Sequence, residues 1–351
     1  MGNQINKPNT HFNPVIYTGN GASTQAITGV NFQPDFLWIK SRSAVEGHLL
    51  VDSIRGSTKR LQSQSTNAED DQTTYGIQSF NSDGFTTGDG ANNNASGYTY
   101  VGWNWLGGGT ASSNSGGSIT SSVSANTTAG FSIATYTGNG TSGSTIGHGL
   151  TSVPSMIITK RTDSANGWGV YHQSLGTGKE LYLNYNFSQQ SSNFWITTPT
   201  TSVFSVSSSD YVNLNNATYV AYCFAEKKGF SKMGSYIASY TSGQSTPNAT
   251  GTPFVYTGFK PAFIMVKDSD VAGDWVIFDS GRSPKNPAYN MLFPNTNGVE
   301  ISSEAIDIYS NGFKPRSNSG YFTTPAGSKF IFLAIAEQPL VGTNGVPATA
   351  R

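Results

Sequence analysis

The chain of 351 residues carries 20 Lys and Arg against 20 Asp and Glu, and charged residues make up only 11% of it. This balance excludes the basic surface that a nucleic-acid-binding protein needs to neutralise phosphates. The single cysteine, Cys223, excludes an internal disulfide framework and a cysteine-ligated zinc cluster. The longest apolar run, residues 330–336, is far shorter than the roughly 20 residues that span a bilayer.

Most of the polar residues are uncharged Ser, Thr, Asn and Gly, and 12% of the chain is aromatic. That aromatic content separates the chain from disordered sequences. β-Branched, aromatic and turn-forming residues favour short strands joined by turns over helices. The composition therefore predicts an all-β protein.

The first part of the chain holds four segments in a fixed order. A Tyr-Thr-Gly turn at 17–21 is followed by a strand at 32–40 that starts near a proline and ends in lysine. A second strand, 48–52, ends in aspartate, and a closing strand spans 100–105. Turn, strand, strand and closing strand together form one candidate repeat unit.

The same four segments recur twice at near-constant spacing. Lysine follows the proline by six residues in every copy, and the second strand ends twelve residues after that lysine. The later copies occupy 136–140, 152–160, 168–172 and 219–224, and then 240–243, 259–267, 275–279 and 330–335. Each copy has roughly 100 residues, the usual size of one β-sandwich. The sequence therefore predicts three tandem β-sandwich modules.

The spacing also sets the expected boundaries. Module 1 covers residues 1–108, module 2 covers 130–228 and module 3 covers 229–338. Residues 109–129, rich in Gly, Ser and Thr, are predicted to be a flexible or extended linker. Residues 339–351 are predicted to be a polar tail.

The closing strand shows which side chains belong to the core. Because side chains alternate along a strand, Trp103 and Trp105 share one face. The third copy has Leu333 and Ile335 at these positions. The tryptophans are therefore predicted to be core residues and not sugar-stacking platforms.

The lysine and the acidic residue of each copy suggest an ion pair. Lys40 with Asp52, and Lys267 with Asp279, are expected to face each other on paired strands as surface salt bridges. The second copy has His172 where the others have aspartate. A shared catalytic role would not tolerate that replacement, so the pairs are predicted to be structural.

No recognisable catalytic motif appears. None of the four histidines lies in a nucleophile motif, and the phosphate-binding and dinucleotide-binding glycine patterns are missing. Paired carboxylates for glycoside hydrolysis stay open, because their separation is spatial. The loop from Asp83 to Asn94 offers oxygen ligands for calcium without the EF-hand spacing, and we leave that site open. We expect no enzyme activity, no cofactor and no bound metal.

A candidate glycan site lies in the second copy. Aromatic residues that do not recur between copies are not required by a shared core, and several lie there among asparagines. The candidate ligand-binding residues are Tyr182, Tyr185, Asn193 and Trp195. The alternative is that these aromatics fill the core of that module or its junction with a neighbour.

At the repeat segments the chain resembles modular virion proteins of tailed bacteriophages, especially phages of marine bacteria and cyanobacteria. The resembling segments are residues 32–43, 48–56, 79–85 and 98–105, and the resemblance is weaker at 330–337. The resemblance implies jelly-roll or concanavalin-like sandwich modules in tail-fibre or adhesin parts, and it brings no catalytic residues.

From the repeat and the resemblance we expect a phage structural protein located in the virion. The leading hypothesis places it in the tail or adsorption apparatus as a homo-oligomer bound to other virion proteins. Host surface glycans are the candidate ligand, and neither nucleic acid nor membrane is expected as a partner. No coiled-coil heptads of a fibre shaft occur, so a capsid decoration protein is the alternative. A virion-borne glycan depolymerase is the less favoured third hypothesis.

Overall fold

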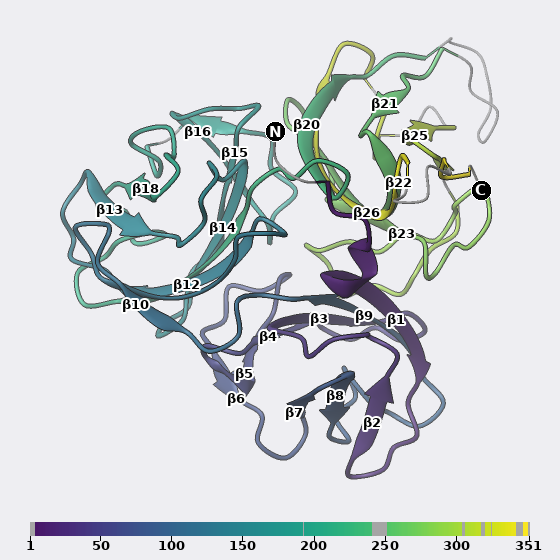
Figure 1. The fold of residues 1–351 in the computed structure, drawn as a ribbon, viewed down its shortest axis with the longest axis horizontal. Coiled ribbons are helices and arrows are strands. Elements are labelled where there is room, and N and C mark those ends of the chain that lie inside the picture. The colour runs from purple at the N-terminus through teal and green to yellow at the C-terminus, as the bar shows by residue number, and fades with distance from the viewer. Residues whose placement is uncertain are drawn as a thin grey trace.

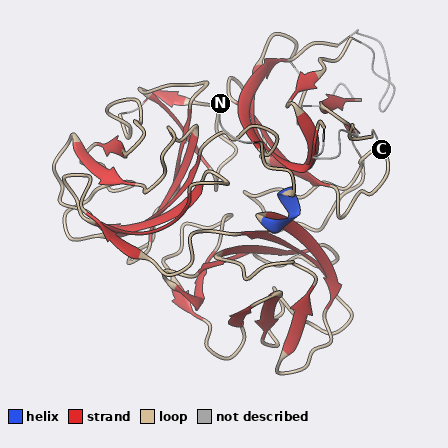
Figure 2. Ribbon diagram, viewed as in Figure 1, coloured by secondary structure: helices blue, strands red, loops and turns tan. Residues whose placement is uncertain are grey.

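The computed structural model describes residues 4–191, 193–240, 251–303, 306–316, 320–323, 325–341 and 347–349. Within these ranges the regular elements are strands, apart from one short 3-10 helix, η1 (Pro8–Thr10). Figure 2 shows strands throughout the molecule and this single helical turn. The predicted all-β fold is confirmed.

The first pair of sheets is built from residues 12–105. Its strands are β1 (Phe12–Thr18), β2 (Gln25–Thr28), β3 (Phe36–Ser41), β4 (Leu49–Asp52), β5 (Gly56–Leu61), β6 (Asp70–Asp71), β7 (Ile77–Asn81), β8 (Gly84–Thr87) and β9 (Thr99–Trp105). The large sheet has the order β1-β9-β3-β4-β5-β6, and the small sheet has the order β2-β8-β7.

The second pair begins within the segment predicted to be a linker. Its strands are β10 (Ser112–Asn114), β11 (Ser121–Asn126), β12 (Phe131–Thr137), β13 (Ser144–Gly147), β14 (Met156–Arg161), β15 (Trp168–His172), β16 (Lys179–Tyr182), β17 (Gln190–Ser191), β18 (Val203–Val206) and β19 (Thr218–Phe224). The large sheet has the order β10-β11-β12-β19-β14-β15-β16-β17, and β13 pairs with β18.

Residues 109–129, predicted to be a flexible or extended linker, instead supply two strands of the second sheet pair. Strand β11 pairs with β12 along its whole length, from Ser121 opposite Tyr136 to Asn126 opposite Phe131. Strand β10 then adds to the outer edge of β11. Ser and Thr are compatible with strands when a neighbour accepts the backbone hydrogen bonds, and composition does not reveal that neighbour.

The third pair follows a short connection. Its strands are β20 (Ser231–Ile237), β21 (Val255–Tyr256), β22 (Phe259–Asp268), β23 (Val276–Asp279), β24 (Ile306–Tyr309), β25 (Gly312–Pro315) and β26 (Lys329–Pro339). The large sheet has the order β20-β26-β22-β23, and the small sheet has the order β21-β25-β24. Residues 241–243 of the predicted opening turn lie outside the described residues, as do 342–346 and 350–351 of the predicted tail.

The closing strand takes the same place in all three large sheets. Strand β9 lies between β1 and β3, β19 between β12 and β14, and β26 between β20 and β22. Its central residues Trp103, Tyr222 and Leu333 share one register. They lie opposite Pro14 and Trp38, Ile133 and Ile158, and Met233 and Met265 respectively. A threefold repeat of one unit predicts this recurrence.

Each large sheet buries both of its faces. One face packs on the small sheet of the same pair and encloses a separate apolar cluster. The opposite faces of all three large sheets meet in one shared core. Figure 1 shows the resulting ring, with the small sheets on the outside and the large sheets toward the centre.

The shared core is densely filled. Trp103 is 0% exposed and Trp105 is 2% exposed, and both belong to this core, as predicted. The residual cavity that the core encloses measures about 10 Å³, which is room for one water molecule at most. Because three sheets supply its side chains, this core holds the whole molecule together.

Candidate functional site

The predicted pairing of Lys40 with Asp52 and of Lys267 with Asp279 is wrong. In both cases the strand register places the aspartate opposite a phenylalanine four residues before the lysine, Phe36 for Asp52 and Phe263 for Asp279. Asp52 instead binds Arg55 at 2.6 Å, and these two side chains are at most 5% exposed. The matching partner of Asp279 is Arg282, at 2.5 Å and fully buried.

The last residue of β4, β15 and β23 contacts the neighbouring sheet pair. This residue is Asp52, His172 and Asp279 respectively. Asp52 accepts a hydrogen bond from the hydroxyl of Tyr222 at 2.8 Å. Asp279 accepts one from Nε1 of Trp103 at 2.9 Å. Tyr222 and Trp103 hold equivalent positions on their closing strands, so the same contact links two of the junctions.

The junction between the second and third sheet pairs explains why His172 replaces aspartate. The equivalent residue on the facing closing strand is Leu333, which has no hydrogen-bond donor. His172 Nε2 donates instead to the backbone carbonyl of Phe332 at 3.2 Å, while its Nδ1 accepts from the Ser174 N–H. Burial lowers the pKa of His172 to about 4, so the ring is neutral in this contact. The position therefore forms a contact between neighbouring sheet pairs at all three junctions.

The three repeat lysines are buried at the edge of the shared core. Lys40, Lys160 and Lys267 are each 0% exposed. Their ammonium groups donate to the carbonyl oxygens of the following residues, Ser41, Arg161 and Asp268, at 2.6–2.7 Å. Burial lowers the pKa of each lysine to about 8. These lysines are structural, although they are not the surface ion pairs that we predicted.

The structure separates the four predicted glycan residues. Trp195 is 2% exposed and packs edge-on against Tyr171 and Phe204 inside the second pair. Its prediction as a sugar platform is wrong, because the ring fills the space between the two sheets. Asn193 is exposed, and Tyr182 and Tyr185 are half-buried.

The two half-buried tyrosines belong to an aromatic cluster at the surface. Tyr185 stacks on Phe187 with ring centroids 4.9 Å apart, and Phe187 is 47% exposed. Tyr182 lies 5.3 Å from Tyr211, which sequence analysis did not include. Below them, buried Glu180 accepts the Tyr182 hydroxyl at 2.5 Å, and burial raises the pKa of Glu180 to about 7.

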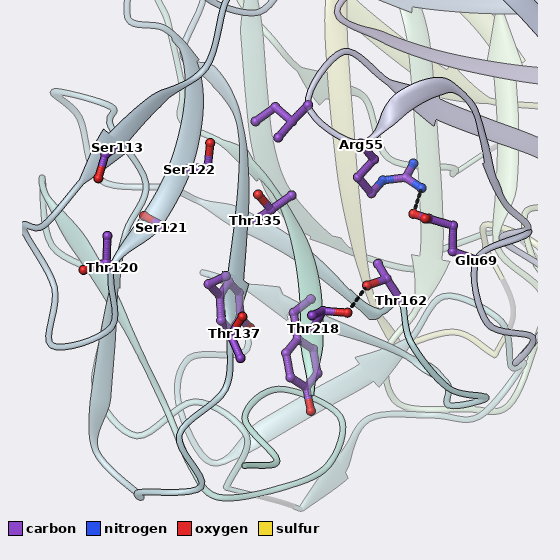
Figure 3. A pocket seen from close by; sticks show the side chains of 13 residues that line it. Arg55, Glu69, Ser113, Thr120, Ser121, Ser122, Thr135, Thr137, Thr162 and Thr218 are labelled. Carbon is purple, nitrogen blue, oxygen red and sulfur yellow. Dashed lines mark hydrogen bonds and ion pairs between the residues drawn. The ribbon is translucent and has the colours of Figure 1, made fainter. Parts of the chain in front are cut away.

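A hollow lies between the first and second sheet pairs. This groove has a volume of about 530 Å³. Figure 3 shows hydroxyl side chains gathered on one wall, with Arg55 and Glu69 opposite them. Its lining residues are Ile54, Arg55, Glu69, Ser113, Thr120, Ser121, Ser122, Thr135, Tyr136, Thr137, Thr162, Thr218 and Tyr219.

The groove forms where one sheet face leaves the shared core. On β12, Phe131 and Ile133 point into the core, and Thr135 and Thr137 continue the same face outward. A backbone hydrogen bond from Glu69 to the carbonyl of Thr162, 2.9 Å long, joins the two sheet pairs beside the groove. Alternating hydroxyls after two core residues are a signal that sequence analysis missed.

The loop considered for calcium is held by hydrogen bonds of its own. The carboxylate of Asp83 accepts the backbone N–H groups of Gly29 at 3.1 Å and Asn31 at 2.6 Å. Asn94 accepts from the N–H of Asn20 at 2.9 Å. Asn213 makes the matching contact in the second pair, so Asn94 belongs to the repeat. Among the described residues, no group of three His, Cys, Asp or Glu side chains gathers for a metal ion.

Fold and site define an all-β protein in which three pairs of antiparallel sheets close around one core, with a hydroxyl-lined groove at one junction. The chain belongs to the family described as a domain of unknown function, DUF7483, whose model matches residues 7–339. Comparison with curated proteins and with solved structures finds no match. In the described ranges no helix is long and apolar enough to cross a membrane.

Proposed function

We propose that this protein is a structural component of a bacteriophage virion, part of the tail or adsorption apparatus, and that it binds host surface glycans. The resemblance of the repeat segments to phage virion proteins supports this assignment. The structural observation that carries it is the closed ring of three sheet pairs around a filled core. Such a ring is a rigid support that presents three outer surfaces to partners.

Attachment through such a component depends on multivalency. Low charge and abundant hydroxyl and amide groups favour weak contacts to uncharged ligands over tight electrostatic binding. Several copies in one virion would raise the effective concentration of each weak site, so that the assembly adheres without breaking any bond. Other virion proteins and further copies of this chain are the expected partners.

Location in the particle tests the assignment. Immunogold labelling and electron cryo-microscopy of purified virions should place the protein on the tail. Copies at regular lattice positions on the head would favour a capsid decoration protein instead. A particle that lacks the protein would overturn the proposal.

Activity against polysaccharide tests the depolymerase hypothesis. Purified protein should leave host polysaccharide intact, with no new reducing ends at high protein concentration. Release of oligosaccharides would show that the protein also cleaves glycans. A pair of carboxylates would then have to be assigned as the catalytic groups.

A further inference from the structure

We propose that the groove between the first and second sheet pairs binds a neutral saccharide. This inference rests on the proposed glycan-binding function and assigns it a site different from the aromatic cluster. The groove volume of about 530 Å³ falls within the range of roughly 300–1,000 Å³ that is usual for ligand pockets.

The groove wall offers unused hydroxyl groups. Ser113, Thr120, Ser122, Thr135 and Thr137 make no side-chain hydrogen bond within the part of the chain that the structure describes. All are exposed or half-buried, so their hydroxyls face the groove solvent. A hydroxyl both donates and accepts, which matches the hydroxyls of a sugar.

The charges of the groove are already neutralised. Arg55 binds Glu69 at 2.8 Å and Asp52 at 2.6 Å, and its side chain is only 5% exposed. The guanidinium is therefore committed to carboxylates and is not free to bind an acidic sugar. A neutral saccharide meets no unpaired charge here, whereas an acidic one would have to compete with Glu69.

The hydroxyl wall is particular to this junction. Thr135 lies opposite Val220, and the equivalent positions are Ile16 on β1 and Ser235 on β20. Strands β1 and β20 end their sheets, whereas β12 is extended by β11 and β10, which supply Ser122 and Ser113, and Thr120 directly precedes β11. The repeat itself does not require these groups, so their clustering at one junction favours a binding role.

The aromatic residues beside the groove set the expected strength. Tyr136 and Tyr219 border it, but both are at most 5% exposed, and their rings pack in the apolar cluster between the two sheets of the second pair. Their hydroxyls donate inward to the carbonyls of Val212 and Asp210. No aromatic face is presented for stacking, so single-site affinity should be weak, consistent with attachment by many copies.

Titration of the isotope-labelled protein by NMR tests the site. The probes are neutral hexasaccharides of glucose, galactose and mannose, and a hexasaccharide of galacturonic acid as the acidic comparison. At least one neutral probe should shift amide signals of 112–114, 120–122 and 135–137. The double variant Ser122→Ala with Thr135→Val should raise the dissociation constant at least fivefold. The matched control, Ser235→Ala with Thr28→Val, removes exposed strand hydroxyls elsewhere and should leave it unchanged.

The possible results separate this inference from the proposed function. Shifts confined to the aromatic cluster around Tyr185, with affinity unaffected by the double variant, would overturn the groove and leave glycan attachment standing. Tighter binding of the acidic probe in the groove would overturn the neutral specificity. No shift with any probe would overturn the groove as a saccharide site, while the virion location is tested separately by microscopy. The thermal unfolding temperature of the double variant should equal that of the wild type. This control shows that a loss of binding does not result from a loss of folding.

Discussion

Asp52 connects two sheet pairs through a single carboxylate. It binds Arg55 within its own pair and accepts the hydroxyl of Tyr222 from the next. All three groups are buried, so each hydrogen bond that is lost leaves a polar atom without water to replace the partner. The junction should therefore be sensitive to removal of one oxygen atom.

Tyr222→Phe should lower the free energy of unfolding by about 1–3 kcal/mol, because the buried carboxylate loses a donor. Chemical denaturation measures this change. Tyr98→Phe is the control, since Tyr98 is 38% exposed, and it should change stability by less than about 0.5 kcal/mol. Equal stability of the two variants would contradict the role given to this contact.

The buried lysines should make stability depend on pH in the alkaline range. Burial lowers the pKa of Lys160 to about 8 in the folded state, from its ordinary value of 10.5. Between these values the unfolded chain holds a proton that the folded protein has released. The lysine therefore makes stability rise with pH by up to about 1.4 kcal/mol per pH unit.

Lys160→Met should reduce this rise between pH 8 and 10. Denaturation midpoints of wild type and variant across that window give the two slopes, and the comparison removes contributions from other groups. Lys285→Met changes an exposed lysine and should keep the wild-type slope. Parallel curves for wild type and Lys160→Met would show that the lysine is solvated in the folded state.

At the scale of elements, β11 shows why a glycine-rich segment need not be flexible. Gly108 packs so closely against the chain that an added Cβ would lie 2.5 Å from the carbonyl oxygen of Ala125. Its N–H also donates to Ser124 Oγ at 2.8 Å. Glycine here permits two backbones to approach closely. Composition alone cannot distinguish this role from the conformational freedom that glycine gives to a flexible linker.

Hydrogen exchange should distinguish the strand from a linker. Amides of β11 that bond to β12 should exchange many times more slowly than an unstructured peptide, because opening them requires separation of the sheet. Exposed residues 23 and 24 serve as the fast-exchanging reference. Equally fast exchange at 121–126 would restore the linker interpretation.

The repeat made the recurrence of the strands along the chain and the core positions of the closing strand predictable, whereas the contacts between copies were not predictable. Trp103 and Trp105 could be placed because the third copy substitutes aliphatic residues at the same positions. Asp52 binds Arg55 in the turn that follows it and Tyr222 from another copy, and Lys40 donates to the backbone carbonyl of the next residue. The recurrence of lysine and aspartate suggested instead that these two side chains pair with each other. The groove was missed because its two walls are separated in sequence and come from different copies.

At the scale of the whole molecule, the shared core should make unfolding cooperative. Side chains such as Phe36, Tyr222 and Phe263 meet there from all three pairs, and Phe36 stacks on Tyr222 with centroids 4.3 Å apart. Separation of one pair would expose these faces to water. The three pairs should therefore unfold together.

Differential scanning calorimetry should show one transition, with a calorimetric enthalpy close to the van't Hoff enthalpy. The fragment 109–228 holds every strand of the second pair, and alone it should be insoluble or unfolded because its share of the shared core has no cover. Three separable transitions, or a stable folded fragment, would indicate modules that are independent. Thermal scans of the full chain at several protein concentrations control for association.

The ring closes between its first and last sheet pairs without a covalent link, and Arg42 binds Glu300 at 2.7 Å across that junction. Residues 4 and 341 also lie side by side, because Gln4 Nε2 donates to the carbonyl of Val341 at 2.6 Å. A peptide joining residue 341 to residue 4, with new ends cut at 107–110, would therefore preserve every sheet. The fold then does not depend on which of the three pairs comes first in the chain. A circular permutant should therefore fold to the same structure.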